Sequence, residues 1–136
     1  GVEQLLRYTD ILIPSEEFAI SHTQEENVFI AAKKLYNLYH PKVVVITRGK
    51  QGGLLYDGSD FTVYPVYPAR VVDSNGAGDV FHGAFAAGLI SGYGYEQCCH
   101  FASAVSALKC TGMGARESVP TRSKVMEFLR RNGYAI

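Results

Sequence analysis

The sequence predicts an α/β fold with a mainly parallel central sheet and a β-hairpin, and three observations lead to it. Val43–Thr47 is a continuous β-branched run, and a strand that is apolar on both faces is typical of a parallel sheet covered on both sides. A helical pattern over residues 28–39 separates this run from an earlier apolar run at 10–14, which gives a β-α-β order. Asp57–Asp60 then joins two short strand patterns and indicates a hairpin.

The first half of the chain alternates helical and strand patterns. Residues 2–7 are typical of the end of a helix, and Asp10–Pro14 is predicted to be a short buried strand closed by proline. Ser15 is a candidate N-cap for a short helix. Thr23 and Glu26 have the spacing of a capping box for the next helix. The apolar face of that helix is predicted to comprise Val28, Ala31, Ala32, Leu35, Leu38 and Tyr39.

The second half begins with the hairpin and ends in helices. Its strands are predicted over Leu54–Tyr56 and Phe61–Val66, and a further short strand over Arg70–Val72. Helices are then expected at about 76–91, 95–111 and 122–132, the last with Thr121 as its cap. The middle helix is rich in small residues, so we expect another element to pack closely against it. The residues expected to point inward on the first and last helices are Phe81, Ala84, Phe85, Gly88, Leu89, Val125, Phe128 and Leu129.

Composition limits the classes of function. The chain has 136 residues, of which 47% are apolar, with 13 basic and 13 acidic side chains. This neutral balance gives no electrostatic reason to expect nucleic acid or a membrane as a partner, and no apolar run has the length of a membrane span. We expect no signal peptide. Cys98, Cys99 and Cys110 predict reduced, buried thiols and a cytoplasmic protein. A metal site at the adjacent pair Cys98 and Cys99 is disfavoured because neighbouring residues on a helix point to different faces.

The most informative stretch runs from an apolar strand pattern through small residues into a helix. Gly76, Ala77 and Gly78 leave the backbone accessible to another molecule. The first N–H groups of the helix lack intrahelical partners, and with the helix dipole they form an anion site. Asp79 adds a carboxylate that could take a proton from an attacking hydroxyl, which is the arrangement that phosphoryl transfer needs. The structural alternative is an ordinary strand-to-helix turn with a favourable first-turn aspartate.

The longer pattern around Asp79 identifies a family. Residues 73–79, followed after three positions by Gly83-Ala84-Phe85-Ala86, resemble the C-terminal signature of the ribokinase-like (pfkB) carbohydrate kinases. A dinucleotide fingerprint would need a third glycine where Phe81 stands, and a P-loop would need an absent Gly-Lys-Ser/Thr. The resemblance implies a three-layer ribokinase-like fold, with Asp79 as catalytic base and residues 76–78 as anion hole. It also implies that residues 1–136 are the C-terminal half of a single kinase domain, without the N-terminal half that would carry the sugar site and any homodimer contacts.

A second glycine-rich stretch follows the most buried strand pattern. Ligands of open α/β sheets collect at the carboxyl ends of strands. The segment Thr47-Arg48-Gly49-Lys50-Gln51-Gly52-Gly53 resembles the Thr-x-Gly-x-x-Gly turn of the family. The resemblance implies nucleotide contacts for Thr47, Gly49 and Gly52, and Lys50 could neutralise phosphate charge. The alternative is a glycine-rich turn with a solvated lysine.

The resemblance also implies a monovalent cation site and an adenine contact. Residues 111–120 resemble the loop that closes the nucleotide and cation site of ribokinase. Gly114 would contact both the nucleotide and the ion, and Ser103 takes the adenine-facing helix position. The ligands of a potassium (K+) ion would be Asp73, Asn75, Gly114 and Ser118. The structural alternative is a plain helix end followed by a loop.

One stretch departs from the family pattern. The family usually has Asn-x-x-Glu after the first strand, which organises magnesium and phosphate, whereas this chain has Ser15-Glu16-Glu17-Phe18. Glu17 could serve from the neighbouring position, or the magnesium arrangement differs, or both glutamates are simple first-turn charges. His82 lies one turn after the anion hole and is interpreted as a packed or solvated helix residue rather than a catalyst.

These expectations converge on an ATP-dependent kinase. The sequence predicts transfer of the γ-phosphate of ATP, with magnesium (Mg2+), to a hydroxyl of a sugar or sugar derivative. A nucleoside kinase of the same family is the nearest alternative. A nucleotide-binding or regulatory module without kinase activity is the alternative from another class.

Overall fold

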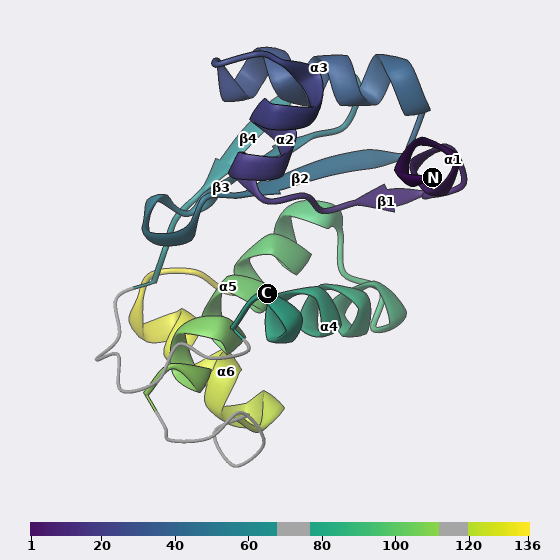
Figure 1. The fold of residues 1–136 in the computed structure, drawn as a ribbon. Helices are drawn as coiled ribbons and strands as arrows, with labels where there is room; N and C mark the ends of the chain where they lie inside the picture. The colour runs from purple at the N-terminus through teal and green to yellow at the C-terminus, as the bar shows by residue number, and fades with distance from the viewer. Residues whose placement is uncertain (68–76, 112–119) are drawn as a thin grey trace. The chain divides into compact units, whose positions relative to one another are not determined.

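The structure, a computed structural model, describes residues 1–67, 77–111 and 120–136, and these form two compact units (Figure 1). The N-terminal unit comprises Gly1–Tyr64 and holds all the strands of the described residues, whereas the C-terminal unit comprises Pro65–Ile136 and is helical. The strand predicted over Arg70–Val72 lies outside the described residues. Each unit has its own packing and is considered by itself.

The N-terminal unit is a mixed four-stranded sheet with helices. Its strands lie in the order β1-β2-β3-β4, with β1 and β2 parallel and the other two pairings antiparallel. The elements are α1 (Val2–Arg7), β1 (Ile11–Leu12), α2 (Glu16–Thr23), α3 (Val28–Tyr39), β2 (Val43–Thr47), the 3₁₀ turn η1 (Gly49–Gln51), β3 (Gly53–Tyr56) and β4 (Phe61–Tyr64).

The lengths of the connections explain why this sheet is mixed rather than mainly parallel. A parallel pair needs a crossover of about a dozen residues or more, whereas a tight turn gives an antiparallel pair. The crossover through α2 and α3 therefore gives the parallel register Ile11↔Val43. The short turn after Thr47 and the predicted hairpin loop Asp57–Asp60 give the antiparallel registers. In the described residues, β2 therefore pairs in parallel with β1 on one side, as expected, and antiparallel with the β3–β4 hairpin on the other.

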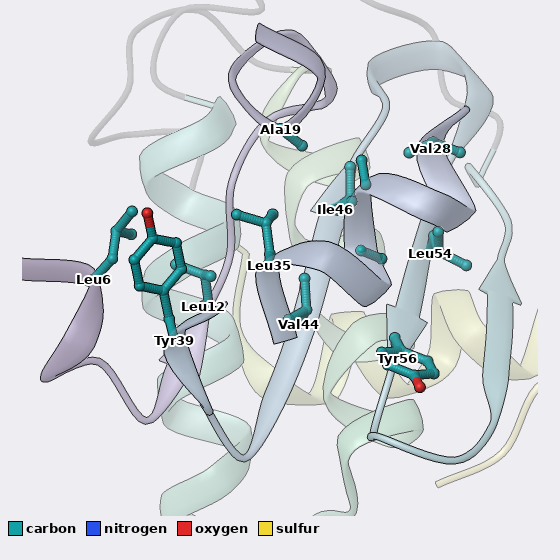
Figure 2. Close-up of a cluster of buried hydrophobic side chains, with 12 residues drawn as sticks. Leu6, Leu12, Ala19, Val28, Leu35, Tyr39, Val44, Ile46, Leu54 and Tyr56 are labelled. Atoms are coloured by element: carbon teal, nitrogen blue, oxygen red, sulfur yellow. The ribbon is translucent and has the colours of Figure 1, made fainter. Parts of the chain in front are cut away.

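The core of the N-terminal unit lies where α2 and α3 cover one face of the sheet (Figures 1 and 2). Val44 and Ile46 from β2 meet Leu35 and Ala32 of α3 there, all fully buried. Burying a branched aliphatic side chain contributes about 1.5–3 kcal/mol. Five of the six residues predicted on the apolar face of α3 are buried, but Leu38 is 48% exposed because it lies at the edge of the apolar stripe.

The caps of the two helices confirm one prediction and correct another. Ser15 caps α2, and its side chain accepts a hydrogen bond from the Phe18 N–H at 3.2 Å. The capping box expected at Thr23 and Glu26 is wrong. Thr23 is the last residue of α2, and its hydroxyl donates to the Ala19 carbonyl at 2.7 Å. Asn27 caps α3 instead, because its amide oxygen reaches the orphan N–H groups of the first turn.

The C-terminal unit consists of α4 (Ala77–Ile90), α5 (Tyr95–Lys109) and α6 (Arg122–Arg131). The small residues of α5 allow the predicted close packing against α4: Ala102 and Ala104 are fully buried, and a Cβ at Gly88 would lie 2.9 Å from the Cys98 sulfur. Of the residues predicted to point inward, Leu89 and Phe128 are half-buried and the others are buried: Phe81, Ala84, Phe85, Gly88, Val125 and Leu129.

The ends of these helices are held by polar side chains. Thr121 caps α6 as predicted, accepting from the Lys124 N–H at 3.4 Å. Arg122 donates to the Tyr93 hydroxyl at 2.7 Å and to the Ser91 hydroxyl at 2.8 Å, which fastens α6 to the α4–α5 turn.

The cysteines are free thiols. Cys98 and Cys99 are buried as predicted, whereas Cys110 is half-buried. Burial raises the pKa of Cys98 to about 11 and also raises the pKa of Cys99, where the negative charges of Cys98 and Glu96 add to the effect. Among residues 1–67, 77–111 and 120–136, no helix combines the length and apolarity of a membrane span.

Candidate functional site

Two stretches that the sequence singled out separately lie side by side at the carboxyl ends of β1 and β2. The Thr47 N–H donates to the Pro14 carbonyl at 3.0 Å, and Ser15 forms an isolated parallel bridge with Thr47. The parallel pairing therefore continues just past β1 and carries the start of α2 to the start of the glycine turn. This edge is where open α/β sheets bind their ligands.

The glycine turn after β2 is closed by its own backbone. The N–H groups of Arg48, Gln51 and Gly52 donate to the carbonyls of Gly52, Arg48 and Gly49, at 2.8, 3.1 and 3.1 Å. Gly49 (φ +56°) and Gly52 (φ +78°, ψ −122°) have left-handed backbones, which only glycine adopts at little cost. The turn is thus a fixed backbone structure rather than an open loop.

The exposure within this turn fits contact with a nucleotide. Gly49 and Lys50 are exposed, and a Cβ at Gly49 would meet nothing within 4 Å. Thr47 is half-buried at the end of β2, whereas Gly52 is buried. Gly49, Lys50 and Thr47 can therefore meet a ligand, and Gly52 contributes by shaping the turn. These roles remain predictions for all four residues.

An ion pair that sequence reasoning missed joins the turn to α2. The Arg48 Nε donates to the Glu16 carboxylate, and both side chains are about one-third exposed or less (26% and 34%). Glu16 is thereby committed to Arg48, whereas Glu17 is exposed. Of the two adjacent glutamates, Glu17 is therefore the one whose carboxylate is not paired with Arg48, and its magnesium role remains a prediction. The positions of residues 16 and 48 gave no sequence signal, since the pairing depends on the register of β1 with β2.

The candidate catalytic carboxylate lies in the first turn of α4. Gly78 and Asp79 are both exposed, and the helix begins at Ala77. The ring of His82 lies one turn later, with its Nδ1 2.7 Å from the Gly78 carbonyl. Since a carbonyl can only accept, this Nδ1 carries the proton. His82 is an exposed helix residue, as interpreted from the sequence, whose ring contacts the turn that bears Asp79.

Ser103 and His100 hold the segment that precedes the candidate anion hole. The buried Ser103 hydroxyl donates to the Pro65 carbonyl at 3.1 Å, and the Tyr67 hydroxyl forms a hydrogen bond with His100 Nδ1. Burial raises the pKa of Tyr67 to about 12, with a smaller contribution from Tyr134. Burial lowers the pKa of His100, against the opposing charge of Glu96. Both groups are therefore neutral near pH 7.

Several predicted site residues lie outside the described residues. These are Gly76 of the anion hole and the four proposed cation ligands, Asp73, Asn75, Gly114 and Ser118. In the part of the chain that is described, no cluster of three or more histidine, cysteine or acidic residues could hold a metal. The potassium site therefore remains a prediction.

The C-terminal unit has two further features that the sequence did not indicate. An open apolar cavity of about 410 Å³ lies among α4, α5 and the start of α6, lined by residues that include Val80, Phe101 and Arg122. Lys109, the last residue of α5, is fully buried, and its Nζ makes no hydrogen bond within the described residues. A lysine so close to a helix end gives no sequence signal of burial, because such residues are mostly exposed.

Comparison with known proteins places the chain in a family. Residues 1–122 match the family model described as pfkB family carbohydrate kinase. The cytidine kinase of Thermococcus kodakarensis is 39% identical over 99 residues, which are 71% of this chain and 35% of that protein. The ribokinase of Bacillus subtilis is 39% identical over 90 residues, 66% of this chain and 31% of that protein.

A solved structure extends the likeness to the fold. The ribokinase of Arabidopsis thaliana, solved with ribose and ATP, is 33% identical and superimposes with a TM-score of 0.85 over 93% of this chain and 42% of that one. This likeness confirms the ribokinase-like α/β fold expected from the sequence. The chain spans less than half the length of each of these relatives.

Proposed function

The chain belongs to the pfkB family of carbohydrate kinases, and we propose that it is the nucleotide-binding and catalytic part of a kinase that phosphorylates a small-molecule hydroxyl. The observation that carries the proposal is the first turn of α4, where an exposed carboxylate, Asp79, stands beside Gly78 and beside helix N–H groups that have no partner within the helix itself. That combination supplies both a base and an anion site at one place.

Within this proposal, Asp79 accepts the proton of the acceptor hydroxyl as that oxygen bonds to the γ-phosphorus and ADP is released. The N–H groups at the start of α4, from Gly76 to Asp79, stabilise the negative charge that develops on the transferring group. Helix N–H groups suit this role because their positions are fixed before the reaction and need no rearrangement.

ATP with magnesium is the phosphoryl donor that we propose. When bound, magnesium neutralises phosphate charge and ATP supplies the phosphoryl group. The exposed Gly49 and Lys50 of the closed turn would contact the nucleotide, and Glu17 is available for the magnesium shell because Glu16 is paired with Arg48. Potassium, through Asp73, Asn75, Gly114 and Ser118, would order the backbone next to the anion hole.

We propose a sugar or sugar derivative as the acceptor, with a nucleoside as the second candidate. Both candidates draw on relatives: the Arabidopsis ribokinase was solved with ribose and ATP, and the Thermococcus relative is a cytidine kinase. The acceptor site itself, and any homodimer contact, would lie in a part of the enzyme beyond this chain. A regulatory module without catalysis is the remaining alternative, and the exposed Asp79 argues against it.

The test is phosphoryl transfer by the full-length protein. ATP and magnesium would be incubated with a panel of pentoses, hexoses and nucleosides, and phosphorylated product and ADP would be quantified by mass spectrometry. We expect stoichiometric product with one class of acceptor, and product formation slower by roughly 10²–10⁴-fold in the Asp79→Asn variant. ATP binding by calorimetry without product from any acceptor would support the regulatory alternative. The 136-residue chain alone is expected to phosphorylate none of them, because it lacks the proposed acceptor site.

A further inference from the structure

The open cavity of the C-terminal unit has walls from three helices. Its volume is about 410 Å³, and its walls include Val80 and Ala84 of α4, Phe101 and Val105 of α5, and Val125 of α6. Phe101, Val105 and Val125 are at most 6% exposed, so these walls belong to the packed interior of the unit. Ligand pockets in proteins are commonly of this size and are lined mainly by apolar side chains. The cavity is therefore large enough for a small organic molecule, and its walls favour one with an apolar part.

Arg122, in the first turn of α6, brings a charged side chain to this cavity. Its guanidinium donates to the Tyr93 hydroxyl at 2.7 Å and to the Ser91 hydroxyl at 2.8 Å. Its central carbon lies 5.6 Å from the ring centroids of both Tyr93 and Phe101. These contacts hold the guanidinium in one place, although the side chain is exposed. The group is thus positioned before a ligand arrives, which lowers the entropic cost of binding.

The groups that hold Arg122 do not neutralise its charge. Hydroxyls and aromatic rings carry no net charge, and within residues 1–67, 77–111 and 120–136 no carboxylate forms an ion pair with this arginine. Its two hydrogen bonds to hydroxyls use only part of the donor capacity of a guanidinium, so further N–H groups remain for an acceptor. Carboxylate and phosphate oxygens are the acceptors that arginine binds most strongly. The cavity therefore combines apolar walls with a positive charge that no described carboxylate balances.

The cavity lies on a different side of α5 from the predicted adenine contact, Ser103. Successive residues of an α-helix are about 100° apart around its axis. Ser103 is two positions from both Phe101 and Val105, so it projects from nearly the opposite side of the helix. Its hydroxyl bonds to the Pro65 carbonyl, and neither of these two residues lines the cavity. A ligand in the cavity would therefore be a different molecule from the nucleotide predicted to contact Ser103.

We propose that this cavity is a second ligand site, for a small carboxylate with an apolar body, whose acid group binds Arg122 and whose apolar part lies between α4 and α5. The apolar part contributes affinity by leaving water, and the charge of Arg122 selects anions over neutral or cationic molecules of the same shape. The inference goes beyond the proposed kinase function and does not depend on it, because binding is measured without nucleotide or acceptor.

The first test compares three probes that share one hydrocarbon chain. Hexanoate, 1-hexanol and hexylammonium are each titrated into the full-length protein by calorimetry. We expect hexanoate to bind at least about 10-fold more tightly than 1-hexanol, the size of one hydrogen bond to a charged group, and hexylammonium to bind more weakly than either. Equal affinities for hexanoate and 1-hexanol would overturn the proposal, because the arginine would then select nothing. Absence of binding up to about 10 mM hexanoate would also overturn it, since the cavity would then be closed or filled in the complete protein.

Two pairs of variants of the full-length protein locate the bound hexanoate. Arg122→Met removes the charge at the cavity, and Lys124→Met is its matched control, because Lys124 is an exposed cation of the same helix that does not line the cavity. Ala87→Leu fills space in the cavity from α4, and Ala86→Leu is its control, because Ala86 is exposed and lies outside the cavity.

Both cavity variants should bind hexanoate at least about 10-fold more weakly than the parent protein, whereas both controls should stay within about twofold of it. Arg122→Met also loses the hydrogen bonds that fasten α6, so circular dichroism must first show that it is folded. If it is not, the Ala87 and Ala86 pair decides the location, because these variants leave Arg122 and its partners unchanged. Equal affinities within the pairs would mean that hexanoate binds elsewhere, and would overturn the proposal.

Discussion

The two units present their candidate functional groups in opposite ways. In the N-terminal unit the glycine turn consists of backbone, three of whose N–H groups are bonded within the turn, and it follows a strand whose first four residues are fully buried. In the C-terminal unit the candidate base, Asp79, is an exposed side chain at the start of a helix. The turn is therefore held by its own backbone and by the sheet, whereas Asp79 is a single side chain carried by the first turn of α4.

The interiors of the two units differ in how many polar side chains they bury. The core of the N-terminal unit is an apolar cluster of strand and helix side chains. The C-terminal unit buries polar groups, including His100, Ser103 and Lys109. Apolar packing tolerates changes of volume poorly, whereas buried polar groups make stability and geometry depend on protonation and on single hydrogen bonds. Substitutions and pH should therefore act differently on the two units.

The largest effect is expected at the exposed carboxylate. Asp79→Asn keeps the size of the side chain and removes the base, so turnover of the full-length protein should fall by roughly 10²–10⁴-fold while nucleotide affinity is nearly unchanged. Steady-state kinetics and ATP titration by calorimetry measure the two quantities. Turnover within about threefold of the parent would mean that Asp79 only stabilises the helix start.

The sequence was sufficient for the elements whose signal is local. The β-branched run of β2, the hairpin loop and the Ser15 and Thr121 caps were all predicted from neighbouring residues and are confirmed. The capping box at Thr23 failed because α3 begins only at Val28, so the first-turn N–H groups that need a cap are those of Phe29 and Ile30, and Asn27 accepts from both. Two competing caps close together cannot be ranked by spacing alone, since each obeys the same rule.

The sequence predicted only those parts of the candidate site that lie within a local motif. The glycine turn and the start of α4 carry a sequence signature, and their exposed residues fit the roles implied by the family. The pairs Arg48–Glu16 and Tyr67–His100 join residues far apart in the chain. Such pairs depend on strand register and helix packing, which no local pattern encodes. They could not be predicted, although they determine which of Glu16 and Glu17 is paired with Arg48 and what holds the Tyr67 side chain against α5.

Two glycine-to-alanine substitutions, one in each unit, compare a glycine in a tightly packed place with a glycine in open space. A Cβ at Gly53 would overlap the ring of Tyr64, which is 2% exposed and has no room to move. Gly53→Ala should lower the free energy of unfolding by about 1–3 kcal/mol. A Cβ at Gly83, in α4, would meet nothing within 4 Å, so Gly83→Ala should raise the free energy of unfolding by up to about 1 kcal/mol through helix propensity. Urea denaturation measures both free energies of unfolding. If both substitutions raised stability, or both lowered it, the expected difference in packing at the two glycines would be contradicted.

Substitution of the two left-handed glycines of the glycine turn, Gly49 and Gly52, should separate effects on stability from effects on nucleotide binding. Gly52 is buried with a φ, ψ pair that only glycine adopts easily, so Gly52→Ala should cost about 1–3 kcal/mol of stability. Gly49 is exposed in open space, and Gly49→Ala should cost about 1–2 kcal/mol while placing a methyl group where the nucleotide would lie. We expect Gly49→Ala to raise the KM for ATP more than Gly52→Ala does, although Gly49→Ala should lose no more stability. Equal KM values in the two variants would remove Gly49 from the nucleotide contacts.

The smallest effect should be a pH dependence confined to the C-terminal unit. Burial lowers the pKa of His100 below its ordinary value, and the nearby Glu96 opposes this only in part. The unfolded chain binds a proton near pH 6.5, whereas the folded chain does so only at lower pH. In that interval the unfolded state holds more protons, so the free energy of unfolding must rise with pH. The contribution of neutral His100 is complete above about pH 6.5 and is lost as the pH falls through the folded pKa.

Two variants isolate this contribution from the other three histidines. His100→Gln removes the buried imidazole and should flatten the rise of the free energy of unfolding with pH in the range below about pH 6.5. His40→Asn is the matched control, because His40 is exposed and asparagine tolerates its left-handed backbone (φ +53°). Urea denaturation of the parent and both variants across this range measures the slopes. A parent slope that His100→Gln leaves unchanged would show that His100 binds its proton equally in the folded and unfolded chains, so that burial does not lower its pKa.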